Sequence, residues 1–187
     1  MTLHDSDWTD LEQVIQAATQ RFVLKLHGIH GIAHWERVRE NGARLAKYTR
    51  ADKRIVELFA FLHDCCREEE GSDPGHGERA ANFAESLRGT LIHLSEEDFA
   101  LLYEAIRDHE LGRTQGDVTV LTCWDADRLD LGRVGVRPKA DYLCTEYARR
   151  KSTIEWACRR SRKTGKQRPG RSEDSEPLWT EYDRDLL

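Results

Sequence analysis

A histidine and an aspartate stand side by side where an apolar segment of the chain ends. The segment, residues 55–62, has the composition of a buried helix, and His63 and Asp64 follow it directly. Burying a carboxylate costs free energy unless a partner neutralises its charge. A metal ion is a natural partner for an imidazole and a carboxylate that arrive together. The pair therefore predicts a metal site, with the polar end of an ordinary helix as the alternative.

Further side chains of the same chemical kind occupy comparable positions, at the ends or inward edges of other predicted helices or beside them. They are His34, His76, His109 and Asp127. A set made only of imidazoles and carboxylates suits manganese, iron, zinc or a similar divalent ion and needs no thiolate. For any one histidine alone, the alternative is a core or surface residue without a metal. We expect that of the others: His4, His27, His30 and His93.

The rest of the chain must position these side chains, and nearly all of it has the apolar spacing of helices. This spacing occurs in residues 8–22, 35–45, 55–62, 80–87, 99–106 and 120–124. Ser6 or Asp7 is the predicted N-cap of the first helix, and Pro138 fits the first turn of a last helix that runs to about Thr153. Because no segment has a strand pattern, the predicted fold class is all-α.

The composition predicts a globular protein without a membrane segment. The chain has 187 residues, of which 39% are hydrophobic, enough to build one domain core. No apolar run approaches the roughly 20 residues that cross a bilayer, and the N-terminus lacks a signal-peptide pattern, so we expect a cytoplasmic protein. The five cysteines form no CxxC pair, which argues against a disulfide framework and against a cysteine zinc cluster.

Charge is distributed unevenly along the chain. The basic segment, residues 149–171, begins at Arg149, ends at Arg171 and carries ten Lys or Arg residues against one Glu. The net charge of the whole chain is nevertheless −5, which is not typical of a dedicated nucleic-acid binder. We expect residues 1–160 to form the domain and residues 161–187 to be a disordered tail. A regulatory module that binds RNA, DNA or an acidic protein through the basic segment is one alternative function.

The motifs around the histidines and aspartates resemble those of the HD superfamily of metal-dependent phosphohydrolases. That family is an all-helical bundle named for its His-Asp pair, and the resemblance covers about residues 28–150. His34 within His-Gly-Ile-Ala-His-Trp resembles the first family histidine, and His63-Asp64 resembles the signature pair. Asp127 within Ala-Asp-Arg-Leu resembles the last aspartate. The resemblance implies a helical bundle with its metal site in the core.

Two more histidines resemble the extra ligands of the binuclear subgroup, His76 and His109. In that subgroup the signature aspartate bridges two metals, so Asp64 would bridge the ions that activate water. The resemblance assigns the other ligands of one ion as His34, His63 and Asp127, and those of the second as His76 and His109. A mononuclear site is the alternative. The expected cofactors are two divalent ions, Fe or Mn, with Zn, Co, Ni or Mg also possible.

Two such ions would support the hydrolysis of a phosphoester. Metal coordination lowers the pKa of bound water from about 15.7 towards 7 and polarises a phosphoryl group. We expect an HD-type phosphoric ester hydrolase that attacks a small phosphomonoester or phosphodiester, with a nucleotide as the substrate class, through a metal-activated hydroxide. An HD-type mixed-valence di-iron oxygenase is the alternative from another reaction class, and it would require oxygen. The oligomeric state stays open.

Supporting roles are expected for a few neighbours of the predicted ligands. Arg67 is a candidate for binding a substrate phosphate, although a salt bridge to the acidic residues 68–70 is the favoured interpretation. Asp125 and Asp130 flank the last ligand, and either could accept a hydrogen bond from a ligating imidazole. The adjacent thiols of Cys65-Cys66 are expected to pack as small apolar side chains.

Overall fold

The computed structural model describes residues 10–164, and within this range the chain forms helices and no strand, as predicted. The longer helices are α1 (Leu11–Arg21), α2 (Ile32–Thr49), α3 (Lys53–Leu62), α4 (His76–Ser86), α5 (Glu96–Asp108), α6 (Val118–Arg128) and α8 (Lys151–Thr164). The shorter ones are α7 (Glu146–Arg149) and the 3₁₀ helices η1 (His109–Leu111), η2 (Leu131–Val134) and η3 (Ala140–Tyr142). The all-α prediction is therefore confirmed.

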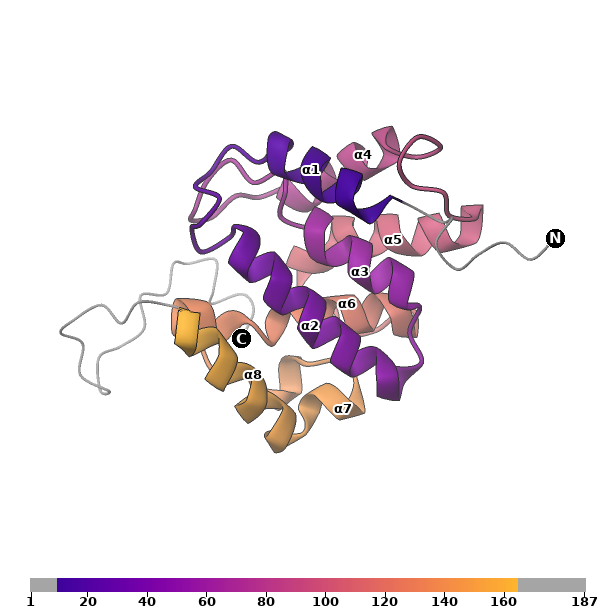
Figure 1. Cartoon of the computed structure of the whole chain (residues 1–187). Coiled ribbons are helices and arrows are strands. Elements are labelled where there is room, and N and C mark those ends of the chain that lie inside the picture. The colour runs from indigo at the N-terminus through magenta and orange to yellow at the C-terminus, as the bar shows by residue number, and fades with distance from the viewer. Residues whose placement is uncertain (1–9, 165–187) are drawn as a thin grey trace.

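Helix α3 forms the centre of the bundle and contacts α1, α2, α4, α5 and α6 (Figure 1). Residues on all its sides are buried, including Leu58, Phe59 and Leu62, because it is surrounded by other helices. Asp52 caps its N-terminus by accepting a hydrogen bond from the backbone nitrogen of Arg54 at 2.8 Å. The opposite end of α3 points into the interior of the bundle, so the residues that follow it, His63 and Asp64, are buried.

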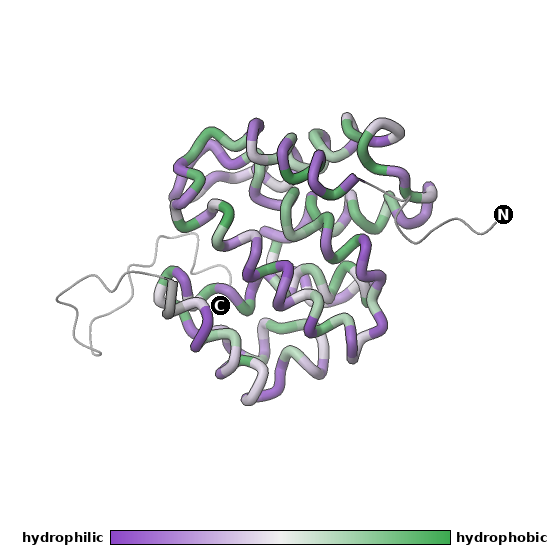
Figure 2. The backbone as a smooth tube through the Cα atoms, in the orientation of Figure 1, coloured by the Kyte–Doolittle hydropathy of each residue, from purple (hydrophilic) through white to green (hydrophobic). Residues whose placement is uncertain are grey.

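The helices around α3 are amphipathic, and hydrophobic and hydrophilic residues alternate along them (Figure 2). In α2, for example, Trp35, Val38 and Leu45 are fully buried, whereas Tyr48 is exposed. Burial at intervals of three and four residues is the helical period that the sequence displays. The predicted inward faces are therefore the faces that pack in the structure.

The start of the first helix differs from the prediction. Helix α1 begins at Leu11, and its N-cap is Asp10, whose side chain accepts a hydrogen bond from the backbone nitrogen of Gln13 at 3.2 Å. The predicted caps, Ser6 and Asp7, lie outside the described residues. Several capping residues precede this helix in the sequence, and capping propensity does not distinguish among them.

The last predicted helix is wrong, because the chain between Pro138 and Thr153 is interrupted. It forms η3, α7 and the start of α8 in place of one helix. Asp125 of α6 accepts hydrogen bonds from the backbone nitrogens of Cys144, at 2.6 Å, and Thr145, at 2.8 Å. These donors are therefore not available to a continuous helix.

The C-terminal boundary also differs from the expected one at residue 160. Helix α8 continues to Thr164, and Ser161, expected in the tail, is a buried helical residue at 1% exposure. The disordered tail expected from there on falls mainly on residues 165–187, which lie outside the described residues.

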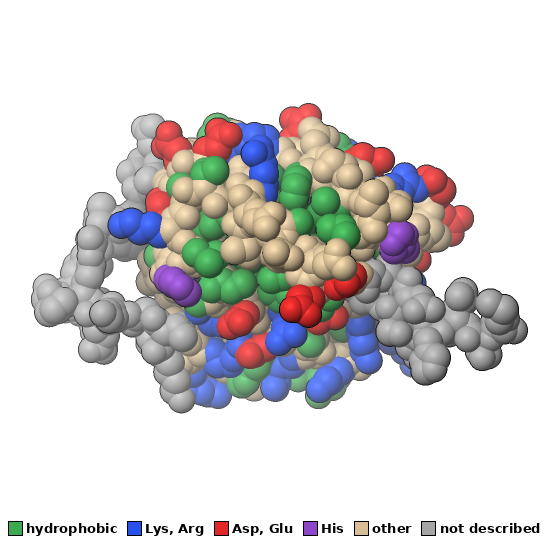
Figure 3. All heavy atoms as spheres, turned by 45° about the horizontal axis from the view of Figure 1, so that its top comes forward, with side chains coloured by type: hydrophobic (Ala, Val, Ile, Leu, Met, Phe, Trp, Pro, Cys, Tyr) green, Lys and Arg blue, Asp and Glu red, His purple; other side chains and the backbone are tan. Residues whose placement is uncertain are grey.

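The surface of the bundle carries charges of both signs. Figure 3 shows acidic and basic side chains around the rim of one face, with hydrophobic side chains exposed between them. Within residues 10–164 no helix combines the length and apolar character required to cross a membrane.

Candidate metal centre

The six predicted ligands lie at helix ends, and their side chains converge beneath the surface. His34 is in the first turn of α2, His63 follows α3, and His109 follows α5. His76 is the first residue of α4, Asp64 follows His63, and Asp127 is in the last turn of α6. The exposed fraction of their side chains is 4% or less, except for 19% at Asp127. The centre is therefore closed on most sides and nearest to solvent at Asp127.

A close approach between two helices helps to bring the second group of ligands together. Gly77 faces the C-terminal end of α5, where a β-carbon at this position would lie 2.6 Å from the carbonyl oxygen of Arg107 and 2.9 Å from that of Ile106. Only a residue without a side chain permits this contact. Helix α4 can therefore place His76 beside His109.

One group of possible ligands consists of His34, His63 and Asp127. The Nε2 atoms of the two histidines are 3.1 Å apart. Asp127 Oδ1 lies 3.4 Å from Nε2 of His34 and 3.8 Å from Nε2 of His63. Donors bound to one ion at about 2.1 Å each are separated by roughly 3.0–3.4 Å in tetrahedral or octahedral geometry. This first group is therefore close to the spacing that one ion requires.

The second group consists of Asp64, His76 and His109. The Nε2 atoms of His76 and His109 are 2.9 Å apart. Asp64 Oδ1 lies 3.3 Å from Nε2 of His76 and 3.6 Å from Nε2 of His109. These separations also match a shared ion, so the six residues form two adjacent candidate sites.

Asp64 is oriented toward both groups. Its Oδ1 atom faces the second group, whereas Oδ2 lies 3.5 Å from Nε2 of His34 and 3.7 Å from Nε2 of His63. A carboxylate placed in this way can donate one oxygen to each of two ions. The bridging position implied by the family resemblance is thus geometrically available.

Hydrogen bonds to the Nδ1 atoms fix the orientation of the His34 and His63 rings. His34 donates a hydrogen bond from Nδ1 to Oδ2 of Asp130 at 2.8 Å, and His63 donates from Nδ1 to the carbonyl oxygen of Phe59 at 3.1 Å. A carboxylate or carbonyl oxygen can only accept, so each Nδ1 carries the proton. In the neutral imidazole, Nε2 then presents a lone pair toward the centre.

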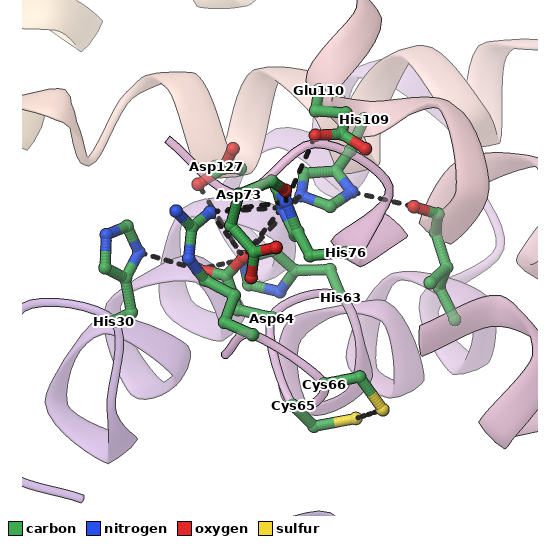
Figure 4. A network of polar contacts seen from close by, with 12 residues as sticks. His30, His63, Asp64, Cys65, Cys66, Asp73, His76, His109, Glu110 and Asp127 are labelled. Atoms are coloured by element: carbon green, nitrogen blue, oxygen red, sulfur yellow. Dashed lines mark hydrogen bonds and ion pairs between the residues drawn. The ribbon is translucent and has the colours of Figure 1, made fainter. Parts of the chain in front are cut away.

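The rings of His76 and His109 are also oriented by hydrogen bonds from their Nδ1 atoms. His76 donates from Nδ1 to the carbonyl oxygen of Asp73 at 2.7 Å, and Oε2 of Glu110 lies 3.1 Å from the same nitrogen. His109 donates from Nδ1 to the carbonyl oxygen of Ile106 at 2.7 Å. Figure 4 shows His76 between Asp64 on one side and Glu110 on the other. All four histidines therefore turn the nitrogen that can bind a metal inward.

This arrangement fits a bound cation. In the first group the Nε2 lone pairs of His34 and His63 face one another at 3.1 Å, and such lone pairs repel unless a cation lies near both. In the second group the Nε2 atoms are 2.9 Å apart, and a proton on His76 occupies this position when no ion is bound. Two carboxylates approach the same nitrogens and add negative charge. Imidazole and carboxylate donors of this kind suit borderline divalent ions such as manganese, iron, cobalt, nickel or zinc.

The protonation of the second group differs from that of the first. Burial lowers the pKa of His63 to about 3, which leaves that ring neutral. Burial also opposes protonation of His76, but hydrogen bonds with Asp64 and Glu110 raise its pKa to about 9. Burial alone would raise the pKa of Asp64, yet the electrostatic interaction with His63 and the hydrogen bonds with the surrounding imidazoles hold it well below the usual range. Asp64 is thus ionised and can act as a ligand.

Of the two flanking carboxylates, Asp130 contacts an imidazole. Besides His34 it accepts hydrogen bonds from Nε of Arg37 at 2.7 Å and from the hydroxyl of Ser161 at 2.6 Å. Asp125 acts differently, since it accepts the backbone donors at residues 144 and 145 and the hydroxyl of Thr145 at 2.6 Å. Asp130 is thus the carboxylate that accepts a hydrogen bond from an imidazole of the centre, whereas Asp125 fixes the backbone of residues 144 and 145 after η3.

Arg67 lies against the centre. Its Nη1 is 3.7 Å from Oδ1 of Asp64 and 3.2 Å from Nε2 of His76. The favoured salt bridge to acidic residues 68–70 is replaced by hydrogen bonds to two backbone carbonyls, those of Glu69 at 3.3 Å and Gly71 at 2.6 Å. A guanidinium held in this way beside the Asp64 carboxylate is well placed to meet an anion.

His30 is a buried residue outside the two groups of candidate ligands, as expected, but it contacts one of the ligands. Its ring is buried, with Nδ1 3.0 Å from Oδ2 of Asp64 and Nε2 3.2 Å from the carbonyl oxygen of Glu70. It therefore holds the Asp64 carboxylate through Oδ2, the oxygen that also faces His34 and His63. His30 lies in the loop before α2, so helical spacing gives no signal for a contact with a residue 34 positions away.

The adjacent thiols of Cys65 and Cys66 are buried, with their sulfurs 3.8 Å apart. Figure 4 shows both turned away from Asp64 and the imidazoles. They pack as small apolar side chains, as expected.

The described part of the basic segment is used within the fold. Arg149 donates from Nε to the carbonyl oxygen of Leu143 at 2.7 Å, and Arg160 donates to Oδ1 of Asn41 at 2.8 Å. The guanidinium of Arg160 also lies 4.5 Å from the centre of the Trp156 ring. These contacts give the arginines structural roles and do not favour a nucleic-acid surface here.

Comparisons with known proteins add one similar structure. No family model and no curated protein matches the sequence. A crystal structure of a predicted HD superfamily hydrolase from an uncultured Thermotogales bacterium is similar to this chain, with a TM-score of 0.62 and 29% sequence identity. The similarity covers 79% of this chain and 84% of the other. Both the fold and part of the sequence are thus shared over most of the two chains.

Proposed function

This chain belongs to the HD superfamily, and from that premise we propose that it is a metal-dependent phosphohydrolase. Its substrate would be a small phosphomonoester or phosphodiester, with a nucleotide as the expected class. The proposed site holds two divalent ions, Fe or Mn in the first place, and the reaction would take place in the cytoplasm.

The observation that carries this proposal is the orientation of Asp64. One of its oxygens lies 3.3 Å from Nε2 of His76, and the other lies 3.5 Å from Nε2 of His34. A single carboxylate directed at two sets of inward nitrogens favours two ions a short distance apart. A pair of ions is suited to the in-line displacement of a phosphoryl group.

Bound ions would lower the pKa of a coordinated water towards about 7 and polarise the phosphoryl oxygens. The protein contributes the geometry around them. Asp130 and the carbonyl oxygens fix the imidazoles, so their nitrogens need little reorganisation when an ion or a substrate binds. Arg67 would donate hydrogen bonds to a phosphoryl oxygen and stabilise charge that develops there.

The test begins with protein purified without added metal, whose metal content is measured by elemental analysis. The protein is then loaded with Mn, Fe, Zn, Co, Ni or Mg and screened against phosphomonoesters, phosphodiesters and nucleotides, with and without oxygen. We expect two ions per chain and phosphate release that does not depend on oxygen.

Other results would contradict the proposal in distinct ways. One ion or none per chain after loading would remove the binuclear site. Two ions without hydrolysis of any phosphoester, accompanied by turnover that requires oxygen, would favour the di-iron oxygenase.

A further inference from the structure

A second arginine, Arg133 of η2, lies at the edge of the centre beside Asp127. Its Nη1 atom is 4.0 Å from Oδ1 of Asp127, and 10% of its side chain is exposed. Nε donates to the carbonyl oxygen of Ile29 at 3.0 Å, which fixes the plane of the guanidinium. Within the described residues, the buried Nη1 atom has no hydrogen-bond partner. A buried donor without an acceptor is costly, so this orientation calls for an acceptor that the fold itself does not provide.

The simplest interpretation is that Arg133 forms an ion pair with Asp127 and has no other function. The separation of 4.0 Å is too long for a hydrogen bond, and Asp127 Oδ1 faces the imidazoles of His34 and His63 at 3.4 and 3.8 Å. Once Asp127 binds an ion, that oxygen has less charge to offer Arg133. The Nη1 donor of Arg133 therefore stays unused by Asp127.

Arg133 also stands where a substrate would enter. Asp127, at 19% side-chain exposure, is the most exposed of the six candidate ligands. Ile29 and Val134, which adjoin the Arg133 guanidinium and backbone, are exposed as well, at 43% and 45%. Among the candidate ligands, the one nearest to solvent is thus the one beside Arg133.

The two arginines approach different candidate ligands of the centre. Arg67 approaches Oδ1 of Asp64, on the side of His76, whereas Arg133 approaches Asp127, the ligand grouped with His34. A single phosphoryl group held by the ions and Arg67 leaves Arg133 free for another acceptor. A guanidinium fork binds phosphate or carboxylate oxygens with two parallel hydrogen bonds.

We propose that Arg133 binds a second anionic group of the substrate, next to the phosphoryl group that reacts. The favoured substrates are then phosphate esters that carry a second phosphate next to the first, such as nucleoside di- or triphosphates, rather than esters with one isolated phosphate. This inference rests on the proposed function of the same site, and it adds a residue that selects among phosphoesters.

The experiment uses the full-length protein loaded with Mn, and the probes are inorganic phosphate and inorganic pyrophosphate. Affinities are measured by isothermal titration calorimetry for the parent, Arg133→Met and Arg133→Gln. The matched control is Arg137→Met, which removes the same charge from an exposed position four residues away. Metal content and thermal unfolding are recorded for every variant. Hydrolysis of a nucleoside triphosphate and of p-nitrophenyl phosphate is measured in parallel.

We expect both Arg133 variants to bind pyrophosphate about 10–100-fold more weakly, the value of one charge-assisted hydrogen-bonded contact, with inorganic phosphate binding unchanged. The triphosphate should lose a similar factor in kcat/KM, while p-nitrophenyl phosphate and the Arg137→Met control should change little.

Equal weakening of phosphate and pyrophosphate would overturn the inference, because Arg133 would then contact the reacting group. No weakening, or loss of the ions from both variants, would also overturn it and leave Arg133 a structural role. If the loaded parent hydrolyses no phosphoester although pyrophosphate binding depends on Arg133, the proposed function fails and the anion contact stands. If the parent is active and the variants match it, only the inference fails.

Discussion

The two halves of the candidate centre are built differently. The first half, His34, His63 and Asp127, comes from α2, α3 and α6, three helices that pack against one another in the core. Behind it, Asp130 connects His34 to Arg37 through buried charged hydrogen bonds. Side chains from the centre of the fold thus hold this half in place.

The second half depends on loops and helix ends. His76 opens α4 after the loop of residues 65–75, and His109 lies where α5 passes into η1. Their outer nitrogens are held mainly by carbonyl oxygens of residues three positions earlier, Asp73 and Ile106. The raised pKa of His76, about 9, means that an ion must displace a proton there, whereas His63 has none to lose. We therefore expect the first ion to bind more tightly than the second.

The largest effect is expected from removing the residue that the two halves share. Asp64→Ala should abolish binding of both ions as a pair and lower hydrolysis by more than about 100-fold, since even an outer partner of a ligand is worth about 10–100-fold. Elemental analysis and phosphate release measure both quantities. Asp141→Ala, an exposed acid of η3, is the control. Two ions retained in Asp64→Ala would show that Asp64 does not bridge.

The next largest effects should separate the halves. His109→Ala should leave one tightly held ion, whereas His63→Ala should lose the first ion and also destabilise the fold, by on the order of 2–3 kcal/mol, because the fully buried His63 ring stacks on Phe59. Metal stoichiometry and denaturant unfolding distinguish the two variants, with the exposed His93→Ala as control. Equal stability losses would contradict the difference between a core half and a loop half.

Asp130→Asn should affect the first half alone. The variant removes the anion behind His34, so the first ion should bind about 10–100-fold more weakly, while the second serves as an internal control. Arg37 loses its buried ion-pair partner at the same time, and breaking such a pair costs about 3–5 kcal/mol. Chelator competition and thermal unfolding measure these changes. Weakening of both ions to the same extent would indicate that the halves are not independent.

The smallest effect is expected from Glu110→Gln. Glu110 lies 3.1 Å from Nδ1 of His76, but the carbonyl oxygen of Asp73 accepts the same proton at 2.7 Å and remains in the variant. The second ion should therefore bind about tenfold more weakly or less, at the low end for an outer partner. Chelator competition at the second site measures this. A loss as large as that of His109→Ala would assign Glu110 to the ligands themselves.

Much of this organisation follows from the sequence because helical periodicity is a local property. The burial of α3 and the helix ends that carry His34 and His109 could be predicted from apolar spacing alone. The family resemblance then grouped the six residues, and the structure brings them together; their binding of metal stays a prediction.

The contacts that could not be predicted depend on segments far apart in the chain. His30 meets Asp64 only because the loop before α2 folds across the end of α3. The break in the last predicted helix has the same origin. The backbone nitrogens of Cys144 and Thr145 donate hydrogen bonds to Asp125, about 20 residues earlier in the chain. Neither contact leaves a periodic trace in the sequence.

The contact between Ser161 and Asp130 has a practical consequence for anyone who shortens this protein. A chain cut at residue 160, where the apolar pattern fades, would lose the hydroxyl that donates to Oδ1 of Asp130 at 2.6 Å. It would also lose the neighbour against which Gly132 packs, since a β-carbon on Gly132 would lie 2.9 Å from that of Ser161. A truncated protein would thus keep all six candidate ligands, but we expect it to bind divalent ions more weakly, because the end of α8 helps to fix the carboxylate that orients His34.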